Sequence, residues 1–261
     1  MKTRLKIVDL GGKSLPFFYE EARPLDFFSV SRQTKGRKFD PNLVLGTASR
    51  CRLGCPRVIL CAPLKIQTQG DGVRLMKKLS NRHDPLCSPV ACLSTKSGFT
   101  ASPEAPNANP YPLEIERKGF ERLFTPFPTS FWLTCPWLVR MAGTAESKGG
   151  VRELERWIER YAYREWIAFN MDHQRTRIAL LPRSMSGFLR RFEPSTLDLL
   201  YRGGVGGIQY RSRGEPARVK CIHLQVASWL ALRRHPGRPW LEDQGLGQDC
   251  DGRLVEICKG R

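Results

Sequence analysis

Three segments of the chain contain a cysteine beside a proline or close to a lysine and a histidine. They are Cys51-x-x-x-Cys55-Pro56, Thr134-Cys135-Pro136 and Val219-Lys220-Cys221-Ile222-His223. A structural zinc ion takes four cysteine or histidine ligands in a tetrahedron, usually with one close pair from a turn and the rest from distant parts of the chain. Cys51 with Cys55, and Cys221 with His223, are the candidate pairs of this kind.

Cys221 and His223 can bind the same metal ion only in certain backbone conformations. Residues two apart in a regular helix point about 200° away from each other. Cys221 and His223 can therefore share one metal only where the segment is still a loop or the first helical turn is distorted. The alternative is a hydrogen-bonded core histidine beside a thiol that packs against a helix.

A nucleophilic thiol is a further interpretation of the same segments. A thiolate at Cys135 or Cys221 could attack an electrophile if neighbouring cations lowered the pKa of that thiol. The neighbours able to do so are Arg218, Lys220 and His223. No third residue that would orient such a pair is evident, so the sequence leaves open whether the protein is an enzyme.

A glycine-rich segment runs from Arg202 to Ile208. Its backbone N–H groups could bind a phosphate together with flanking cations. It is not a Walker loop, because no Lys-Ser or Lys-Thr follows it. The competing interpretation is a glycine turn that closes a helix. The candidate phosphate-binding residues are Arg202, Gly203, Gly204, Gly206, Arg218 and Lys220.

The positive charge of the chain lies mainly in two blocks. The 261 residues include 43 Lys and Arg against 25 Asp and Glu. Residues 1–63 hold twelve basic and five acidic side chains, and residues 201–240 hold eight basic and one acidic. Such blocks attract phosphate-rich partners, so we expect a nucleic acid or a nucleotide as partner. The basic residues that would bind it are Arg202, Arg211, Arg213, Arg218 and Lys220.

The nine cysteines occur in a chain with no recognisable secretory signal. No run approaches the about 18 apolar residues of a membrane span. We therefore expect a cytoplasmic protein that does not enter a membrane, with thiols that stay reduced instead of pairing in disulfides.

Periodicity predicts an α+β fold with a small, partly covered sheet. We expect strands at 5–10 and 57–60, and at 127–139 a buried strand or extended segment that ends in a turn at Thr134-Cys135-Pro136. Apolar residues three or four apart predict helices near 150–180 and 217–235 that pack on this sheet. Ser195 with Asp198 has the form of a capping box and predicts a short helix ending at Gly203.

The chain divides into two parts of one core and an insertion. Residues 1–63 form the N-terminal part of the core, residues 64–126 the insertion, and residues 127–261 the main part. Six prolines lie between residues 84 and 112, among Ser, Thr, Asn and Ala. This composition neither continues a helix nor pairs as a central strand, so we expect the insertion to be partly disordered.

At the same thiol and glycine segments, the chain resembles the uncharacterised bacterial domain-of-unknown-function family numbered five-hundred-and-one. The resemblance covers residues 48–63 and 127–240. The matching stretches are Arg50-Cys51 with Gly54-x-Pro56 and Val58-Ile59, Phe127-Pro-Thr-x-Phe-Trp-Leu-Thr-Cys-Pro136, Arg202-Gly-x-Val-Gly-Gly207, and Val219-Lys-Cys-Ile-His223 followed by Ala227.

The resemblance implies a cytoplasmic protein without an established activity, and it singles out four residues of the shared motifs. These are Cys51, Cys135, Cys221 and His223, which we predict to hold a structural or redox metal, zinc or an iron-containing centre. Where the family often carries further histidines after the Cys-x-His pair, this chain has Gln225 and Ser228. The alternatives are a basic module that binds RNA or a nucleotide phosphate, and a cysteine-dependent hydrolase or transferase.

Overall fold

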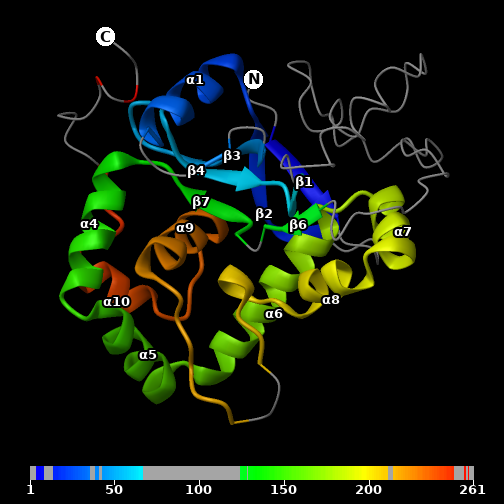
Figure 1. Cartoon of the computed structure of the whole chain (residues 1–261). Coiled ribbons are helices and arrows are strands. Elements are labelled where there is room, and N and C mark those ends of the chain that lie inside the picture. The colour runs from blue at the N-terminus through cyan, green and yellow to red at the C-terminus, as the bar shows by residue number, and fades with distance from the viewer. Residues whose placement is uncertain are drawn as a thin grey trace.

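A computed structural model of the whole chain describes residues 4–8, 14–35, 39–40, 43–66, 124–127, 129–210 and 214–249, together with Glu256 and Cys258. The fold is α+β, as the sequence predicts (Figure 1). Among these described residues, no helix is both long enough and apolar enough to cross a membrane.

A five-stranded sheet forms the centre of the fold. Its order is β1-β2-β3-β4-β7, and every neighbouring pair is antiparallel. The strands are β1 (Arg4–Val8), β2 (Ser14–Glu21), β3 (Val44–Arg50), β4 (Pro56–Cys61) and β7 (Phe131–Leu133).

Strand β4 is buried on both of its faces. Successive side chains of a strand point to opposite faces of the sheet. Val58 and Leu60 join the main hydrophobic cluster of the protein, while Ile59 and Cys61 join a second cluster on the other face. The continuous apolar run after the Cys51–Cys55 turn is therefore a central strand that is covered on both faces.

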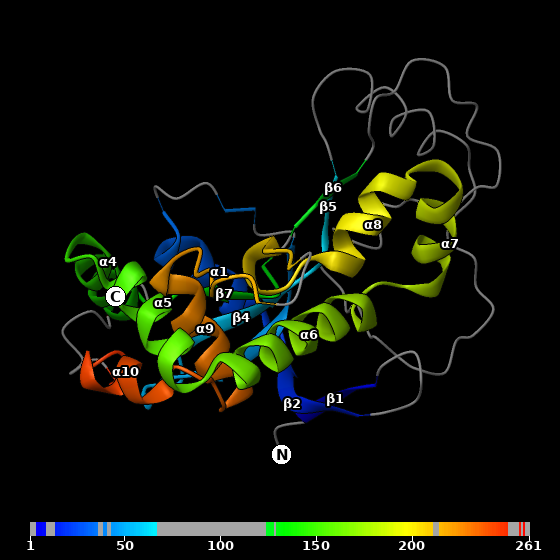
Figure 2. The ribbon, with the colours of Figure 1, turned by 90° about the horizontal axis from the view of Figure 1, so that it is seen from below.

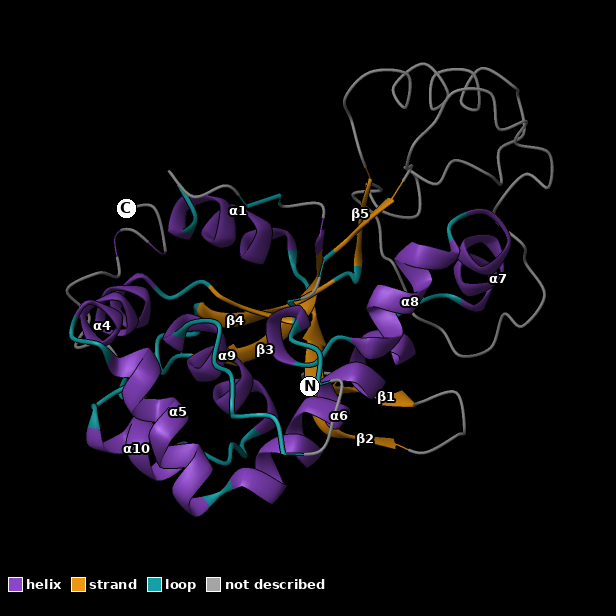
Figure 3. Cartoon of the chain, turned by 60° about the horizontal axis from the view of Figure 1, so that its bottom comes forward, coloured by secondary structure: helices purple, strands orange, loops and turns teal. Residues whose placement is uncertain are grey.

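Two helices cover the two faces of the sheet. Helix α1 (Pro24–Gln33) contributes Val30 to the second cluster, and α9 (Ile222–Leu232) contributes its apolar residues to the main one. Helix α9 is buried on nearly all sides, as expected of a helix that is apolar all round. It lies between the sheet and the outer helices in both Figure 1 and Figure 3.

The other helices that the structure describes lie around α9 or extend away from it to one side of the sheet, as Figure 2 shows. They are α4 (Pro136–Ser147), α5 (Gly150–Tyr161), α6 (Tyr163–Ala179), α7 (Arg183–Phe192), α8 (Pro194–Arg202), α10 (Arg238–Asp243) and the short 3-10 turn η2 (Val205–Gly207).

The predicted helix near 150–180 is present as two helices. Ala162 separates α5 from α6 because its backbone is not helical, with φ −149° and ψ 28°. The sequence could not show this break, because Ile158, Ala162 and Trp166 are all buried and keep the four-residue spacing across it. The predicted helix near 217–235 is α9, which begins at Ile222.

The predicted strand or extended segment at 127–139 contains β7, which ends just before the predicted turn at 134–136. The helix α4 then begins at Pro136 and was not predicted; proline suits this first position, where the amide would have no helical partner. One local prediction was wrong. The capping box at Ser195 is absent, because α8 begins earlier, at Pro194. The residue before α8 is Glu193, whose Oε2 accepts a hydrogen bond from Thr196 Oγ1 at 3.0 Å.

The ends of the predicted insertion lie side by side. Strands β5 (Leu64–Ile66) and β6 (Phe124–Pro126) form a separate antiparallel pair, with Leu64 opposite Pro126. Residues 67–123 lie outside the described residues, and so do Cys87 and Cys92. The division of the chain into 1–63, 64–126 and 127–261 therefore stays a prediction.

Candidate metal centre

Three side chains converge at the start of α9: one from α4, one from the residue before α9 and one from its first turn. Glu146, Cys221 and His223 each offer one ligand atom, and these three atoms lie within 4.8 Å of one another. In the part of the chain that the structure describes, no other three or more His, Cys, Asp or Glu side chains gather in this way. All three residues are half-buried, so the group is reachable from solvent.

The backbone at Cys221 allows the thiol and the imidazole to meet. Cys221 is the N-cap of α9 and has an extended conformation, with φ −168° and ψ 158°, while His223 lies in the first helical turn. The condition set by the sequence is therefore met: the segment is still a loop at Cys221. Residues two apart point in opposed directions only where both are helical.

Glu146 lies in the last turn of α4 and caps α9. Its Oε1 accepts hydrogen bonds from the amides of Ile222, at 2.6 Å, and His223, at 3.3 Å. The same atom lies 2.8 Å from Nδ1 of the His223 ring. A carboxylate is favourable here, because the first amides of a helix lack helical partners and carry partial positive charge.

The thiol of Cys221 is not activated by its surroundings. Burial raises the pKa of Cys221 above its usual value, and the nearby carboxylate of Glu146 raises it further. The amides of Leu224 and His223 and the ammonium of Lys220 lower this pKa, but they do not outweigh burial. Cys221 therefore carries its proton at neutral pH unless a metal ion displaces it.

Side chains of α5 and α6 hold the segment that leads to Cys221. Glu155 Oε1 accepts the amide of Val219 at 2.8 Å, and Glu159 Oε1 accepts the amide of Ala217 at 3.0 Å. The hydroxyl of Tyr163 donates to the carbonyl of Glu215 at 2.6 Å. Three alternate residues of this segment are thus fixed by neighbouring helices, which sets the direction in which the chain enters α9.

Residues 47–238 match the family described as Protein of unknown function (DUF501). The chain belongs to this family. The resemblance seen in the sequence is thereby confirmed, and Glu146, Cys221 and His223 all lie inside the matched region of the DUF501 chain. No curated protein and no solved structure matches the chain.

The other two predicted ligands of the DUF501 protein, Cys51 and Cys135, are not members of the converging group. Cys51 opens the turn between β3 and β4, where its amide donates to the carbonyl of Cys55 at 3.0 Å. Cys135 is the N-cap of α4 and is buried in the main hydrophobic cluster. The structure thus brings together Cys221 and His223 of the predicted set and adds Glu146.

Glu146 could not be identified from the sequence. It stands far from Cys221 along the chain, and it belongs to a helix that was not predicted. A helix N-terminus at Ile222 without a capping side chain at Cys221 is the one available signal, because such a terminus needs acceptors from elsewhere.

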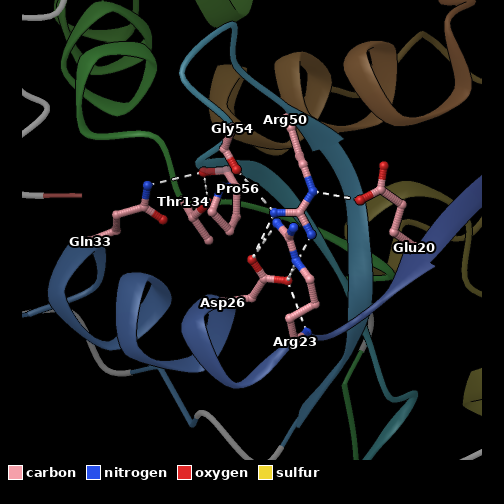
Figure 4. Close-up of polar contacts among 8 residues, drawn as sticks. All are labelled: Glu20, Arg23, Asp26, Gln33, Arg50, Gly54, Pro56 and Thr134. Atoms are coloured by element: carbon pink, nitrogen blue, oxygen red, sulfur yellow. Dashed lines mark hydrogen bonds and ion pairs between the residues drawn. The ribbon is translucent and has the colours of Figure 1, made fainter. Parts of the chain in front are cut away.

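The family motif at Arg50 has a structural explanation (Figure 4). Arg50 Nε lies 2.6 Å from Glu20 Oε2, and its two terminal nitrogens lie 2.7 Å from the two oxygens of Asp26. Burial raises the pKa of Asp26, but hydrogen bonds from Arg50 and Arg23 outweigh burial, so this pKa lies below its usual value. Arg50 also donates to the carbonyl of Gly54 at 3.1 Å, which ties the Cys51 turn to α1.

The glycine-rich segment closes α8 and directs its amides into the protein. Gly204 donates to the carbonyl of Ile208 at 2.7 Å, and Val205 donates to Oδ1 of Asn170 at 3.0 Å. The carbonyls of Gly203 and Gly204 accept hydrogen bonds from the guanidinium of Arg177, which is buried. These contacts correspond to the glycine turn that closes a helix.

The predicted phosphate-binding cations have partners within the fold. Arg202 pairs with Asp198 at 2.6 Å, and Arg218 pairs with Glu215 at 2.8 Å. Lys220 Nζ donates to the carbonyl of Gly206 at 3.3 Å. Arg211 and Arg213 lie outside the described residues. Phosphate binding at these residues stays a prediction.

Proposed function

We propose that this DUF501 protein binds one zinc ion through Glu146, Cys221 and His223. The observation that carries the proposal is the convergence of a thiol, an imidazole and a carboxylate within 4.8 Å at the start of α9. These are the three side-chain types that ligate zinc in proteins.

The donor set favours zinc over iron. Iron–sulfur clusters are held by four cysteine thiolates, and the group contains one thiol. Mononuclear non-haem iron commonly takes two histidines and one carboxylate, and the group contains one histidine. Zinc accepts a mixed sulfur, nitrogen and oxygen set, because it has no geometric preference from its d electrons.

A three-ligand site leaves room for a fourth ligand. Structural zinc sites are closed by four protein ligands, whereas catalytic sites keep one position for water or substrate. Glu146, Cys221 and His223 provide three, and the side chains of Glu146 and His223 are 27% and 29% exposed, so a water or a small ligand can reach the ion. The proposed site is therefore of the open type.

The raised pKa of Cys221 supports ligation over nucleophilic catalysis. A nucleophilic cysteine needs a lowered pKa, so that thiolate is present at neutral pH. Burial acts in the opposite direction at Cys221. A metal ion supplies the missing stabilisation, because it binds the thiolate directly and releases the proton.

Zinc stoichiometry tests the proposal. The purified full chain is dialysed against zinc and then against zinc-free buffer, and its metal content is measured by plasma mass spectrometry. We expect about one equivalent in the native protein and a loss of most of it in Cys221→Ser. Cys51→Ser is the matched control, because Cys51 is also a half-buried thiol of a family motif but is not a member of the group.

Two results would refute the proposal. One is less than about half an equivalent of zinc in the native protein. The other is equal retention of zinc by the native protein and Cys221→Ser. If Cys51→Ser lost zinc as well, the result would instead support the ligand set predicted from the sequence, which includes Cys51 and Cys135.

A further inference from the structure

Helix α5 presents a row of arginines to solvent. Arg152, Arg156 and Arg160 are all exposed and follow one another at four-residue spacing. With a rise of 1.5 Å per residue, neighbours in such a row are about 6 Å apart along the helix. None of the three forms an ion pair with a residue that the structure describes.

The acidic residues of α5 are largely separated from this row. Glu155 and Glu159 are turned toward the segment that leads to Cys221, where they accept the amides of Val219 and Ala217. The one other carboxylate on the helix, Glu153, is exposed in the first turn. The arginines therefore keep most of their charge available to a partner, although three glutamates share the helix with them.

An exposed aromatic side chain lies at the end of the row. Tyr161 is 60% exposed, and its ring centroid lies 5.3 Å from that of Trp157. The guanidinium of Arg160 lies 5.2 Å from the centre of the Tyr161 ring. Trp157 and Arg160 thus hold the Tyr161 ring in place, while most of its surface stays exposed and available for stacking.

We propose that this face, defined by Arg152, Arg156, Arg160 and Tyr161, binds single-stranded nucleic acid. The arginines would contact successive phosphates, and the Tyr161 ring would stack on a base. Single-strand binding surfaces combine positive charge along the backbone with aromatic platforms for bases. Helix α5 lies at the outside of the fold, on the far side of α9 from the sheet (Figures 1 and 3).

This surface is distinct from the proposed zinc site and from the cations near the glycine-rich segment. Arg202 and Arg218 are paired with carboxylates of the fold, whereas the α5 arginine side chains make, among the described residues, only a hydrogen bond from Arg156 Nε to the Arg152 carbonyl at 3.4 Å and the contact of Arg160 with Tyr161. The large excess of basic residues in the chain favours the same class of partner, because it attracts polyanions over a long range.

Fluorescence anisotropy with the full-length protein tests the proposal. The probes are a short fluorescein-labelled oligouridylate and an oligothymidylate of equal length, at low salt. We expect Arg156→Ala/Arg160→Ala to weaken binding by about tenfold or more and to reduce the salt slope by about 1.4, which is about 0.7 for each of the two arginines removed. Tyr161→Ala is expected to weaken binding by about tenfold, while Tyr161→Phe retains it.

A matched control is available on α7. Arg190 and Arg191 are both exposed, and the guanidinium of Arg191 lies 5.2 Å from the Phe192 ring centroid, as that of Arg160 does from Tyr161. Arg190→Ala/Arg191→Ala removes the same charge and a similar ring contact at another place. We expect this variant to bind nearly as well as the native protein.

The proposal is overturned if the native protein binds neither probe at low salt. It is also overturned if the two double variants weaken binding equally, because charge alone would then explain it. Equal loss in Tyr161→Ala and Tyr161→Phe, or no loss in either, would refute the stacking role. Equal affinity for both probes supports a general single-strand site, and tighter binding of oligouridylate supports RNA as the natural partner.

Discussion

Glu146 contacts His223 through both its ring and its backbone. A single carboxylate oxygen, Oε1, lies 2.8 Å from Nδ1 of the imidazole and 3.3 Å from the backbone nitrogen. When Nδ1 donates to this carboxylate, the ring orientation is fixed and Nε2 carries the lone pair. In the metal-free protein Glu146 thus orients the His223 ring and caps α9, and it also offers the carboxylate ligand of the proposed site.

The capping role predicts a loss of stability without metal. Glu146→Ala removes the acceptor of the Ile222 amide and should destabilise the metal-free protein by about 1 kcal/mol, the usual cost of losing a helix cap. Glu146→Gln keeps an acceptor oxygen and should cost less. Urea unfolding in the presence of a chelator measures both values. Glu153→Ala, at an exposed position of α5, is the control; if it costs as much as Glu146→Ala, the cap explanation is wrong.

The thiol of Cys221 predicts that zinc affinity rises with pH. The metal must displace the thiol proton, and burial raises the pKa of this thiol, so the proton competes with zinc at neutral pH. We expect about a tenfold gain in affinity for each pH unit between about pH 7 and pH 8.5. Competition with a chromophoric chelator measures it. Cys51→Ser should retain the slope, and an affinity that does not change with pH would show that no thiol is a ligand.

Two buried histidines predict that the protein loses stability in mild acid. His173 and His235 each contact the ring of Phe169, with 4.8 Å between centroids. The pKa of both histidines is lowered from 6.5 to about 3, mainly by burial; at His173 nearby positive charges, led by that of Arg177, contribute to this lowering. The unfolded chain therefore binds more protons than the folded one between these two values.

The sign of this effect follows from proton linkage. The contribution of each neutral, buried histidine to the free energy of unfolding is complete above about pH 6.5. It is lost as the pH falls toward 3, at about 1.4 kcal/mol per pH unit for each histidine. Urea unfolding at several pH values measures the slope for the native protein and for His173→Phe. A phenylalanine at position 173 suits the aromatic surroundings, which include Phe131. In His173→Phe the slope of unfolding free energy against pH should be lower by about 1.4 kcal/mol per pH unit. An unchanged slope would contradict a neutral buried His173.

Alanine substitution is expected to have opposite effects on stability at Gly204, in the turn after α8, and at Gly187, in α7. A Cβ on Gly204 would overlap the side-chain oxygen of Asn170, whereas a Cβ on Gly187 would have no atom within 4 Å. Gly204→Ala should therefore destabilise the protein by about 2 kcal/mol. Gly187→Ala, on an exposed position of α7, should stabilise it by about 0.5 to 1 kcal/mol. Thermal unfolding of both variants checks the contrast, and a neutral Gly204→Ala would disprove the close packing of the turn.

The elements that bury a regular apolar pattern could be predicted from the sequence. The short apolar run at 57–60 indicated a strand, and the apolar spacing near 217–235 indicated a helix; these are β4 and α9. Both segments are rich in apolar residues because β4 is buried on both faces and α9 on nearly all sides. The boundary at Ala162 could not be predicted, because the apolar spacing continues across the change in helix direction.

The candidate site could be predicted only in part. Cys221 and His223 are close in sequence, so their spacing was informative. Glu146 joins them through the packing of α4 against α9; the uncapped start of α9 indicates that its first amides need an acceptor, but not which residue supplies it. The proline at 136 was interpreted as ending an extended segment, although it begins the helix that carries Glu146.

X-ray absorption at the zinc edge of the zinc-loaded full chain tests the central claim most directly, because it counts the sulfur ligands of the ion. We predict one sulfur at about 2.3 Å with nitrogen and oxygen ligands at about 2.0 to 2.2 Å, and loss of the sulfur shell in Cys221→Ser. A spectrum with no sulfur, or one with several sulfurs that persist in Cys221→Ser, would contradict a site built from Glu146, Cys221 and His223.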